Sequence, residues 1–493
     1  MQTKDLSVGR PLRLLLLFSL PMVLSVVFQQ LYNIADSVIA GRFLGKEALA
    51  AVSASYPVTI IYLCVGTGYS VGCGVVMSRA YGKKDILGLK TAVSTSFLSL
   101  AAIGVVISAA AYFTAKPLLM LLSTPPEVLE DAAAYLKFYS LGMTFVYVYN
   151  ACSVTFQALG NSVIPLIFLI SSTVLNVGLD LLFLRFEGAG VWSLSVATVA
   201  AQGAAAILSV AVLFGLLTQV KAEKTDGQAA EPQTAAAGKR ALKIGSIAAA
   251  GRALRSMGAY ICLKKPYRLF SGAIFIELIR IGVPGILQAA TVSVGQLFIQ
   301  NLVNSYGTDV IAGYGAAVKI SAFLVQITVT EANALSIFIS QNAGAGTHKR
   351  IGQGMRAGFM IILISCAATA AVGLALAPDL IALFAADEAS GVVVEIGSRM
   401  LRTIVPFYFV VIIKFWADAL LRGVGAMSGF VVGTLLDLVV RVGGAYLFAH
   451  LLGSETGIWW SWPAGWVVGT LTAVIFALSG RWKKRLTMLP LTR

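Results

Sequence analysis

Charged residues and histidine are scarce in this chain. Asp, Glu, Lys and Arg make up 12% of its 493 residues, about half of their share in an average soluble protein. Only His348 and His450 could supply imidazoles. These shortages exclude an ordinary soluble domain and a metal site built from several histidines. The cysteines, which show no C-x-x-C spacing, are Cys64, Cys73, Cys152, Cys262 and Cys366.

Catalytic motifs are missing as well. The sequence contains no H-E-x-x-H zinc motif and no nucleophile motif with acid and base partners. We therefore expect a protein that is not an enzyme and that needs no cofactor.

Long apolar runs, by contrast, fill the chain. Hydrophobic residues make up 58% of the sequence, and a helix that spans a bilayer needs about 20 of them in succession. The pattern predicts an all-α membrane protein with twelve transmembrane helices. They are expected near residues 14–38, 51–76, 91–113, 135–157, 164–184, 190–217, 277–303, 310–338, 355–376, 398–421, 428–450 and 458–479.

Basic residues gather between these runs. A net charge of +15 could indicate a nucleic-acid partner, but Lys and Arg concentrate in alternate loops, as in the cytoplasmic loops of membrane proteins. We therefore predict a multi-pass protein of the cell membrane with both termini in the cytoplasm and no nucleic-acid partner. The clusters are Arg10 and Arg13; Arg79, Lys83, Lys84 and Lys90; Lys349, Arg350 and Arg356; and Arg481, Lys483, Lys484 and Arg485.

A change of composition after the sixth run divides the chain into two lobes. Residues 1–217 form a predicted N-lobe and residues 273–480 a predicted C-lobe, with six spans each. The basic segment 218–272 is a predicted cytoplasmic linker that lies against anionic lipid, and residues 481–493 form a basic cytoplasmic tail. The alternation of basic and apolar residues in the linker fits either an interfacial helix or a solvated segment.

The two lobes show a faint internal repeat. Pro21 and Pro284 are 263 residues apart, and Gly82 and Gly344 end two similar segments that are 262 residues apart. Because each lobe has an even number of spans, both lobes begin on the same side of the membrane. The repeats are therefore parallel and related by a pseudo-two-fold axis along the membrane normal. Such two-lobed proteins are typically transporters that expose a central cavity to alternate sides.

The first span carries a polar stripe. Gln29, Asn33 and Asp36 lie on one helical face at i, i+4 and i+7. Since a carboxylate at the bilayer centre costs roughly 2.5–3.5 kcal/mol on insertion scales, the stripe should face protein or water. It is either an ion or proton site or a surface for hydrogen bonds between helices. We place Asp36 at an ion site and expect the substrate cavity to include Gln29, Tyr32 and Asn33.

A second carboxylate lies within the fifth span. Asn176 and Asp180 share one helical face, and Thr198 in the sixth span adds a hydroxyl. If these helices converge with the first span, Asp36 and these three residues offer only oxygen ligands. Such ligands suit a hard cation such as Na⁺, or two carboxylates that share one proton. Alternatively, Asp180 is structural and pairs with Arg185.

The acids of the C-lobe have basic neighbours. Asp418 lies one helical turn after Lys414, and Asp437 one turn before Arg441, so each pair should neutralise itself. The ion site is therefore assigned to the N-lobe alone.

Two further charges of the C-lobe are assigned to the substrate cavity. Lys319 and Glu331 are about 120° apart around their predicted helix, so they cannot pair with each other. At least one of them should face the cavity.

Four segments of the sequence form a recognisable set. They are Gln29 to Asp36 with the following Gly41 to Gly45, Asn176 to Phe183, Gln157 to Asn161, and Gln341 to Gly346. Together they resemble the multidrug and toxic compound extrusion (MATE) family over nearly the whole chain except the linker. The resemblance implies two six-helix bundles that form a V. It also implies export of cationic, amphipathic drugs or toxins in exchange for inward Na⁺ or H⁺ by alternating access.

The resemblance assigns roles to single residues. Asp36 would be the coupling acid. Asn176, Asp180 and Thr198 would complete the cation site, which would bind Na⁺ if a metal ion is used. Bending of the first helix at Pro21 would link ion binding to substrate release.

One position departs from the family. Some members carry an acid in the middle of the seventh span, where this chain has Val292 with Gln288 and Gln296 nearby. This puts a C-lobe cation site in doubt, and the two amides are assigned to the cavity. We expect a monomer that transports small organic cations. The alternative is a lipid-linked saccharide flippase of related architecture, which would need several unpaired Arg or Lys residues, whereas only Lys319 lacks an acidic neighbour.

Overall fold

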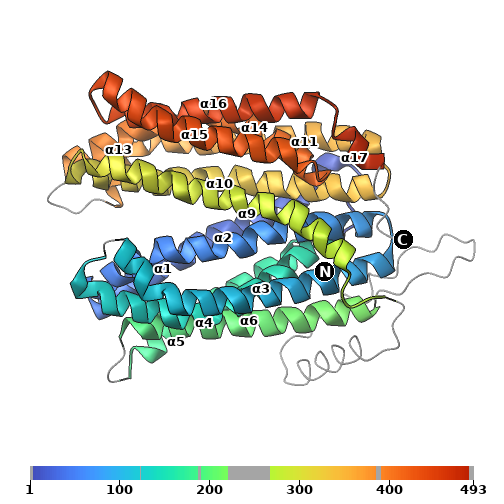
Figure 1. The fold of residues 1–493 in the computed structure, drawn as a ribbon, viewed down its shortest axis with the longest axis horizontal. Coiled ribbons are helices and arrows are strands. Elements are labelled where there is room, and N and C mark those ends of the chain that lie inside the picture. The colour runs from blue at the N-terminus through green and yellow to red at the C-terminus, as the bar shows by residue number, and fades with distance from the viewer. Residues whose placement is uncertain (1–3, 123, 187–189, 220–266, 385–389, 488–493) are drawn as a thin grey trace, which may run out of the picture.

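A computed structural model describes residues 4–122, 124–186, 190–219, 267–384 and 390–487. These residues fold into a bundle of long helices (Figure 1). The elements of the N-terminal half are α1 (Pro11–Ile39), the π-helical turn η1 (Ala40–Leu44), α2 (Lys46–Gly82), α3 (Ile86–Leu121), α4 (Pro126–Ala158), α5 (Val163–Phe183) and α6 (Val191–Gln219). The second half contains α9 (Gly272–Asn304), α10 (Thr308–Gly344), α11 (His348–Ala375), α12 (Ala377–Ala382), α13 (Ser390–Ile404), the 3₁₀ turn η2 (Val405–Phe407), α14 (Tyr408–Gly423), α15 (Met427–Leu452), α16 (Thr456–Leu478) and α17 (Lys483–Thr487).

The predicted all-α membrane fold is confirmed. Within the described ranges, eleven segments are long and apolar enough to cross a membrane, and α13, η2 and α14 together make one of them. Helix α4 corresponds to the remaining predicted span, near residues 135–157. It is 33 residues long, but its four tyrosines and the acids near its start make it less apolar than the others. Most of the predicted linker, including its candidate interfacial helix, lies outside the described residues.

The helices form two groups that are close together at one end (Figure 1). Helices α1 to α6, in blue to green, make one group, and α9 to α16, in yellow to red, make the other. Both termini lie at the end where the groups approach each other, and the ribbons diverge toward the opposite end.

Helix α1 belongs to both groups. Its buried residues Leu15, Phe18 and Met22 pack in the same hydrophobic core as residues of α10, α11 and α14. The other N-terminal helices share a second core with the first part of α9, through Ile274, Leu278 and Ile281, and with the start of α15. The first half of α1 is therefore anchored in the C-lobe, although the helix begins the N-lobe.

Two glycines of the internal repeat lie at a close contact between the lobes. A Cβ atom on Gly82 would overlap the carbonyl oxygen of Gln341, and one on Gly344 would overlap the carbonyl oxygen of Arg79. Only glycine allows α2 and α10 to approach so closely. The two repeat-related segments thus pack on each other at the end of the molecule that holds the termini.

Side chains next to these glycines cross between the lobes in equivalent ways. Arg79 Nη2 donates to the carbonyl oxygen of Gly423 over 3.3 Å, and Gln341 Nε2 donates to that of Ala158 over 2.7 Å. The donors are 262 residues apart and the acceptors 265, which matches the repeat. Leu6, which is fully buried, adds a bond from its backbone nitrogen to Gln341 Oε1 of 3.0 Å.

Candidate functional site

The carboxylate of α1 lies just before an irregular turn. Asp36 is half-buried, three residues before the end of the helix at Ile39. The π-helical turn η1 follows, and Gly45 then allows the chain to enter α2 with φ of 90°. Single π-helical turns within helical segments are frequent at functional sites. This turn redirects the chain directly after Asp36.

The structure brings the two N-lobe acids together around one amide. When the Asn176 side chain is oriented so that its nitrogen and oxygen are both satisfied, Nδ2 donates to Asp36 Oδ1 over 3.0 Å and to Asp180 Oδ2 over 3.1 Å. The carboxyl groups of Asp36 and Asp180 also interact directly. Asn176 and Asp180 are each only 1% exposed. Asn176 therefore bridges α1 to α5 inside the lobe.

Helix α6 completes this cluster. Thr198 is buried, and its Oγ1 lies 3.3 Å from the Asn176 oxygen in the same orientation. Its hydroxyl is also 3.1 Å from that of Tyr32 on α1. The four predicted ion-site residues thus meet in one place, at the junction of α1, α5 and α6.

The two acids of this cluster lack a cationic partner. Among the described residues, no ion pair involves Asp36 or Asp180. Arg185 is exposed, so the alternative pairing with Asp180 is not formed. Asp180 Oδ1 is buried and has no hydrogen-bond partner within the described chain. An unpaired carboxylate in a membrane-spanning segment is a candidate functional group.

Two tyrosines of α4 join the cluster, and sequence reasoning missed them. Tyr135 and Tyr139 stack with ring centroids 6.0 Å apart and an interplanar angle of 17°. Both are close enough to Asp36 to interact with it electrostatically. Their i, i+4 spacing on one helical face was a visible signal. Aromatic faces beside a carboxylate suit organic cations.

A small cavity lies beside Asn176 and Thr198. Its volume is about 30 Å³, enough for a water molecule or an ion. Gln29 and Tyr32 line it, and the Asn33 amide donates to Gln30 Oε1 over 3.3 Å. The other lining residues are Leu169, Ser172, Thr173, Asn176, Thr198, Ala201 and Gln202.

The predicted ion pairs of the C-lobe are confirmed. Lys414 Nζ lies 2.7 Å from Asp418 Oδ2, and Arg441 Nη2 lies 2.5 Å from Asp437 Oδ2. All four side chains are buried. Each acid of this group therefore has its counter-ion on the same helix.

The C-lobe residues assigned to the cavity are dispersed. Glu331 is buried and accepts a hydrogen bond from Ser365 Oγ over 2.6 Å. Lys319 is exposed, with its Nζ 5.7 Å from the centre of a phenylalanine ring. Gln288 and Gln296 are half-buried on α9. None of the four lines the small N-lobe cavity.

The family model and the similar proteins of known name agree with each other. The MatE family model matches residues 21–182 and 284–447, two regions that begin 263 residues apart. The probable multidrug resistance protein YpnP of Bacillus subtilis is 27% identical over 98% of each chain. The multidrug export protein MepA of Staphylococcus aureus is 23% identical over 90% of this chain and 88% of its own.

Solved structures share the fold. A MOP superfamily transporter from Pyrococcus furiosus superposes with a TM-score of 0.81 at 21% identity. A multidrug resistance MATE family transporter of the MOP superfamily, in an outward-facing conformation, superposes with a TM-score of 0.80 at 20% identity. Both cover 99% of this chain and 100% of their own. The family model matches well over half of the residues of this chain, with one matched region in each half of the sequence. The chain therefore belongs to the MATE family of multidrug efflux transporters and is not an enzyme.

Proposed function

We propose that the protein exports cationic, amphipathic organic compounds in exchange for an inward proton by alternating access. The observation that carries this proposal is the contact of Asp36 with Asp180 through Asn176, in a buried place without a cationic partner. The multidrug export named for the relatives supports an organic cargo.

Exchange follows from the chemistry of a buried acid. A carboxylate in surroundings of low dielectric constant attracts a cation more strongly than it would in water. Once a proton neutralises the carboxylate, this attraction is lost. Cargo and proton then compete for the same negative charge, and that competition is the physical basis of antiport.

The Asn176 amide favours a proton over Na⁺. In the orientation that satisfies both amide atoms, its nitrogen donates to both carboxylates and its oxygen faces Thr198, so in that orientation the amide offers no oxygen to a metal ion between the acids. Na⁺ would need several oxygen ligands there. Two carboxyl groups in contact can instead share one proton, because like charges so close together disfavour ionisation of both.

Helix α1 connects the acids of the N-lobe to the core of the C-lobe. Asp36 lies in the N-lobe cluster, whereas Leu15 and Phe18 of the same helix are buried in the C-lobe core. Pro21 lies between these two regions and removes one helical hydrogen bond, which lets the helix bend there. Protonation of the acids could therefore change how α1 joins the lobes.

The flippase alternative receives less support. A phosphate-bearing substrate would need several unpaired cations inside the molecule. Lys414 and Arg441 are instead bound to acids of their own helices. Lys319 is exposed near an aromatic ring.

Transport in proteoliposomes tests the proposal. A pH gradient of one unit is worth about 1.4 kcal/mol per proton and could sustain about a tenfold concentration ratio of a monovalent cation. We expect purified protein to accumulate ethidium against its gradient when the pH difference is imposed, and Asp36→Asn to bring the ratio close to one. Asp309→Asn is the matched control, because Asp309 is an exposed acid at the start of α10.

Each outcome is informative. Accumulation driven by a Na⁺ gradient but not by a pH gradient would replace the proton with Na⁺. Unchanged accumulation by Asp36→Asn would remove the proposed site. Flipping of a saccharide lipid without ethidium movement would favour the flippase.

A further inference from the structure

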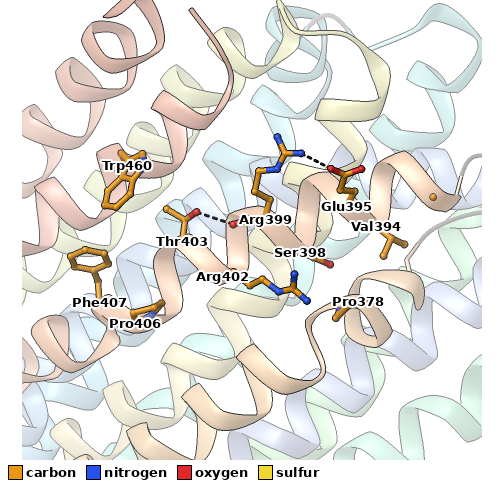
Figure 2. Close-up of a pocket in the computed structure, with 11 residues that line it drawn as sticks. Pro378, Val394, Glu395, Ser398, Arg399, Arg402, Thr403, Pro406, Phe407 and Trp460 are labelled. Atoms are coloured by element: carbon orange, nitrogen blue, oxygen red, sulfur yellow. Dashed lines mark hydrogen bonds and ion pairs between the residues drawn. The ribbon is translucent and has the colours of Figure 1, made fainter. Parts of the chain in front are cut away.

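A larger pocket lies in the C-lobe, remote from the acids. Its volume is about 610 Å³, and it is formed by α12, α13, η2 and α16 at the end of the molecule opposite the termini (Figures 1 and 2). Its lining includes Glu395, Ser398, Arg399, Arg402, Phe407 and Trp460. No lining residue comes from the N-lobe, so the pocket is separate from the proposed ion site.

One arginine of the pocket has no acidic partner among the described residues. Arg399 lies 2.5 Å from Glu395 and 3.7 Å from Glu455, so its charge is compensated. Arg402, one turn further along α13, is exposed and makes no hydrogen bond or ion pair with the described residues. In Figure 2 the side chains of Arg402 and Ser398 lie on the same part of α13.

A buried hydroxyl lies beside this arginine. Ser398 lines the pocket and is only 4% exposed, yet its Oγ has no hydrogen-bond partner in the described chain. A buried hydroxyl without a partner is costly. Arg402 and Ser398 together therefore offer donors to an anion that the protein itself does not supply.

The other part of the pocket is apolar. The rings of Phe407 and Trp460 meet edge to face, with centroids 5.9 Å apart, and Trp460 remains 46% exposed. The membrane segment begins at Gly391. Arg402 comes before Phe407 in this segment and is therefore closer to its start. The polar part thus lies nearer the interface, and the apolar part extends toward the acyl chains.

We propose that this pocket binds an anionic phospholipid of the leaflet opposite the termini. Its phosphate accepts hydrogen bonds from Arg402 and Ser398, because a guanidinium is well suited to phosphate oxygens. Its acyl chain covers Phe407 and Trp460. A small soluble anion would leave the apolar part uncovered, and a cationic cargo would be repelled by Arg402.

Fluorescence quenching by lipids with brominated acyl chains tests this site. The full chain is placed in nanodiscs with brominated phosphatidylglycerol or brominated phosphatidylcholine, and the Trp460 signal is isolated by subtracting a Trp460→Phe sample. We expect phosphatidylglycerol to half-quench Trp460 at a concentration about fivefold lower than phosphatidylcholine, since the phosphate of phosphatidylglycerol has no choline ammonium to compete with Arg402. Arg402→Gln should abolish this preference, and Ser398→Ala should reduce it.

The matched control is Arg185→Gln, which removes an exposed arginine of the N-lobe with the same change in net charge. It should keep the preference, and size-exclusion profiles should show that all variants remain folded. Equal quenching by both lipids in the parent protein would overturn the proposal, as would an unchanged preference in Arg402→Gln. Loss of the preference on adding inorganic phosphate would identify a soluble-anion site instead. Displacement of the lipid by ethidium would identify a cargo site.

Discussion

The two lobes bury acids in opposite ways. In the N-lobe, Asp36 and Asp180 lie together around Asn176 without a cation. In the C-lobe, Asp418 and Asp437 are each bound to a base of their own helix. An acid without a counter-ion can respond to a proton or to a cationic cargo. An acid that is already paired with a base binds a proton or a cationic cargo less readily. The two lobes therefore differ in the partners of their buried acids and not in the type of residue.

The internal repeat sharpens this contrast. With an offset of 265 residues, Arg441 takes the place of Asn176, and Ala445 that of Asp180. Ala445 is fully buried. The C-lobe therefore has a base where the N-lobe has its bridging amide, and a small apolar residue where the N-lobe has an acid.

The largest expected effect comes from breaking a C-lobe pair. Asp437→Asn would leave the buried Arg441 charge without a partner, and we expect the free energy of unfolding to fall by about 3–5 kcal/mol. Thermal unfolding in detergent would show the change. Replacing both residues by leucine should recover most of the loss, because no unpaired charge remains. If Asp437→Asn is as stable as the parent protein, Asp437 does not compensate the charge of Arg441.

An intermediate effect is expected in the N-lobe, on transport and not on stability. Asp180→Asn removes one of two adjoining acids, so the thermal transition should stay the same or rise as the like-charge repulsion disappears. Ethidium accumulation driven by a one-unit pH gradient should fall from about tenfold toward one. A marked loss of stability would mean that Asp180 is structural.

The smallest effect is expected for Glu331, the exception within the C-lobe. It is buried like the N-lobe acids and its Oε2 has no partner in the described chain, but only Ser365 binds its other oxygen and no second acid is in contact. We expect Glu331→Gln to change the accumulation ratio by no more than about twofold, or 0.5 kcal/mol. A collapse equal to that of Asp36→Asn would show that both lobes take part in coupling.

Sequence periodicity predicted features that depend on a single helix. The pairs Lys414 with Asp418 and Asp437 with Arg441 follow from i, i+4 spacing alone. Sequence periodicity predicted helix boundaries less accurately where a helix is interrupted. The predicted span 398–421 begins earlier, in α13, and is broken at Val405–Phe407, because Pro406 has no N–H to continue the helix.

Contacts between helices were harder to predict. The tyrosines Tyr135 and Tyr139 were missed beside Asp36 because hydropathy and spacing within α4 do not show which helix it faces. The same holds for Arg402 and Trp460, which lie on different helices and meet in one pocket only after folding.

The sequence by itself determined the apolar spans, the polar face of the first helix and the local charge pairs, because each follows from the fixed geometry of one helix in a bilayer. Only the tertiary structure decided that α1, α5 and α6 meet at Asn176, since residues about 140 positions apart are brought together by packing, which no local periodicity specifies. That packing left two acids of the N-lobe without a counter-ion.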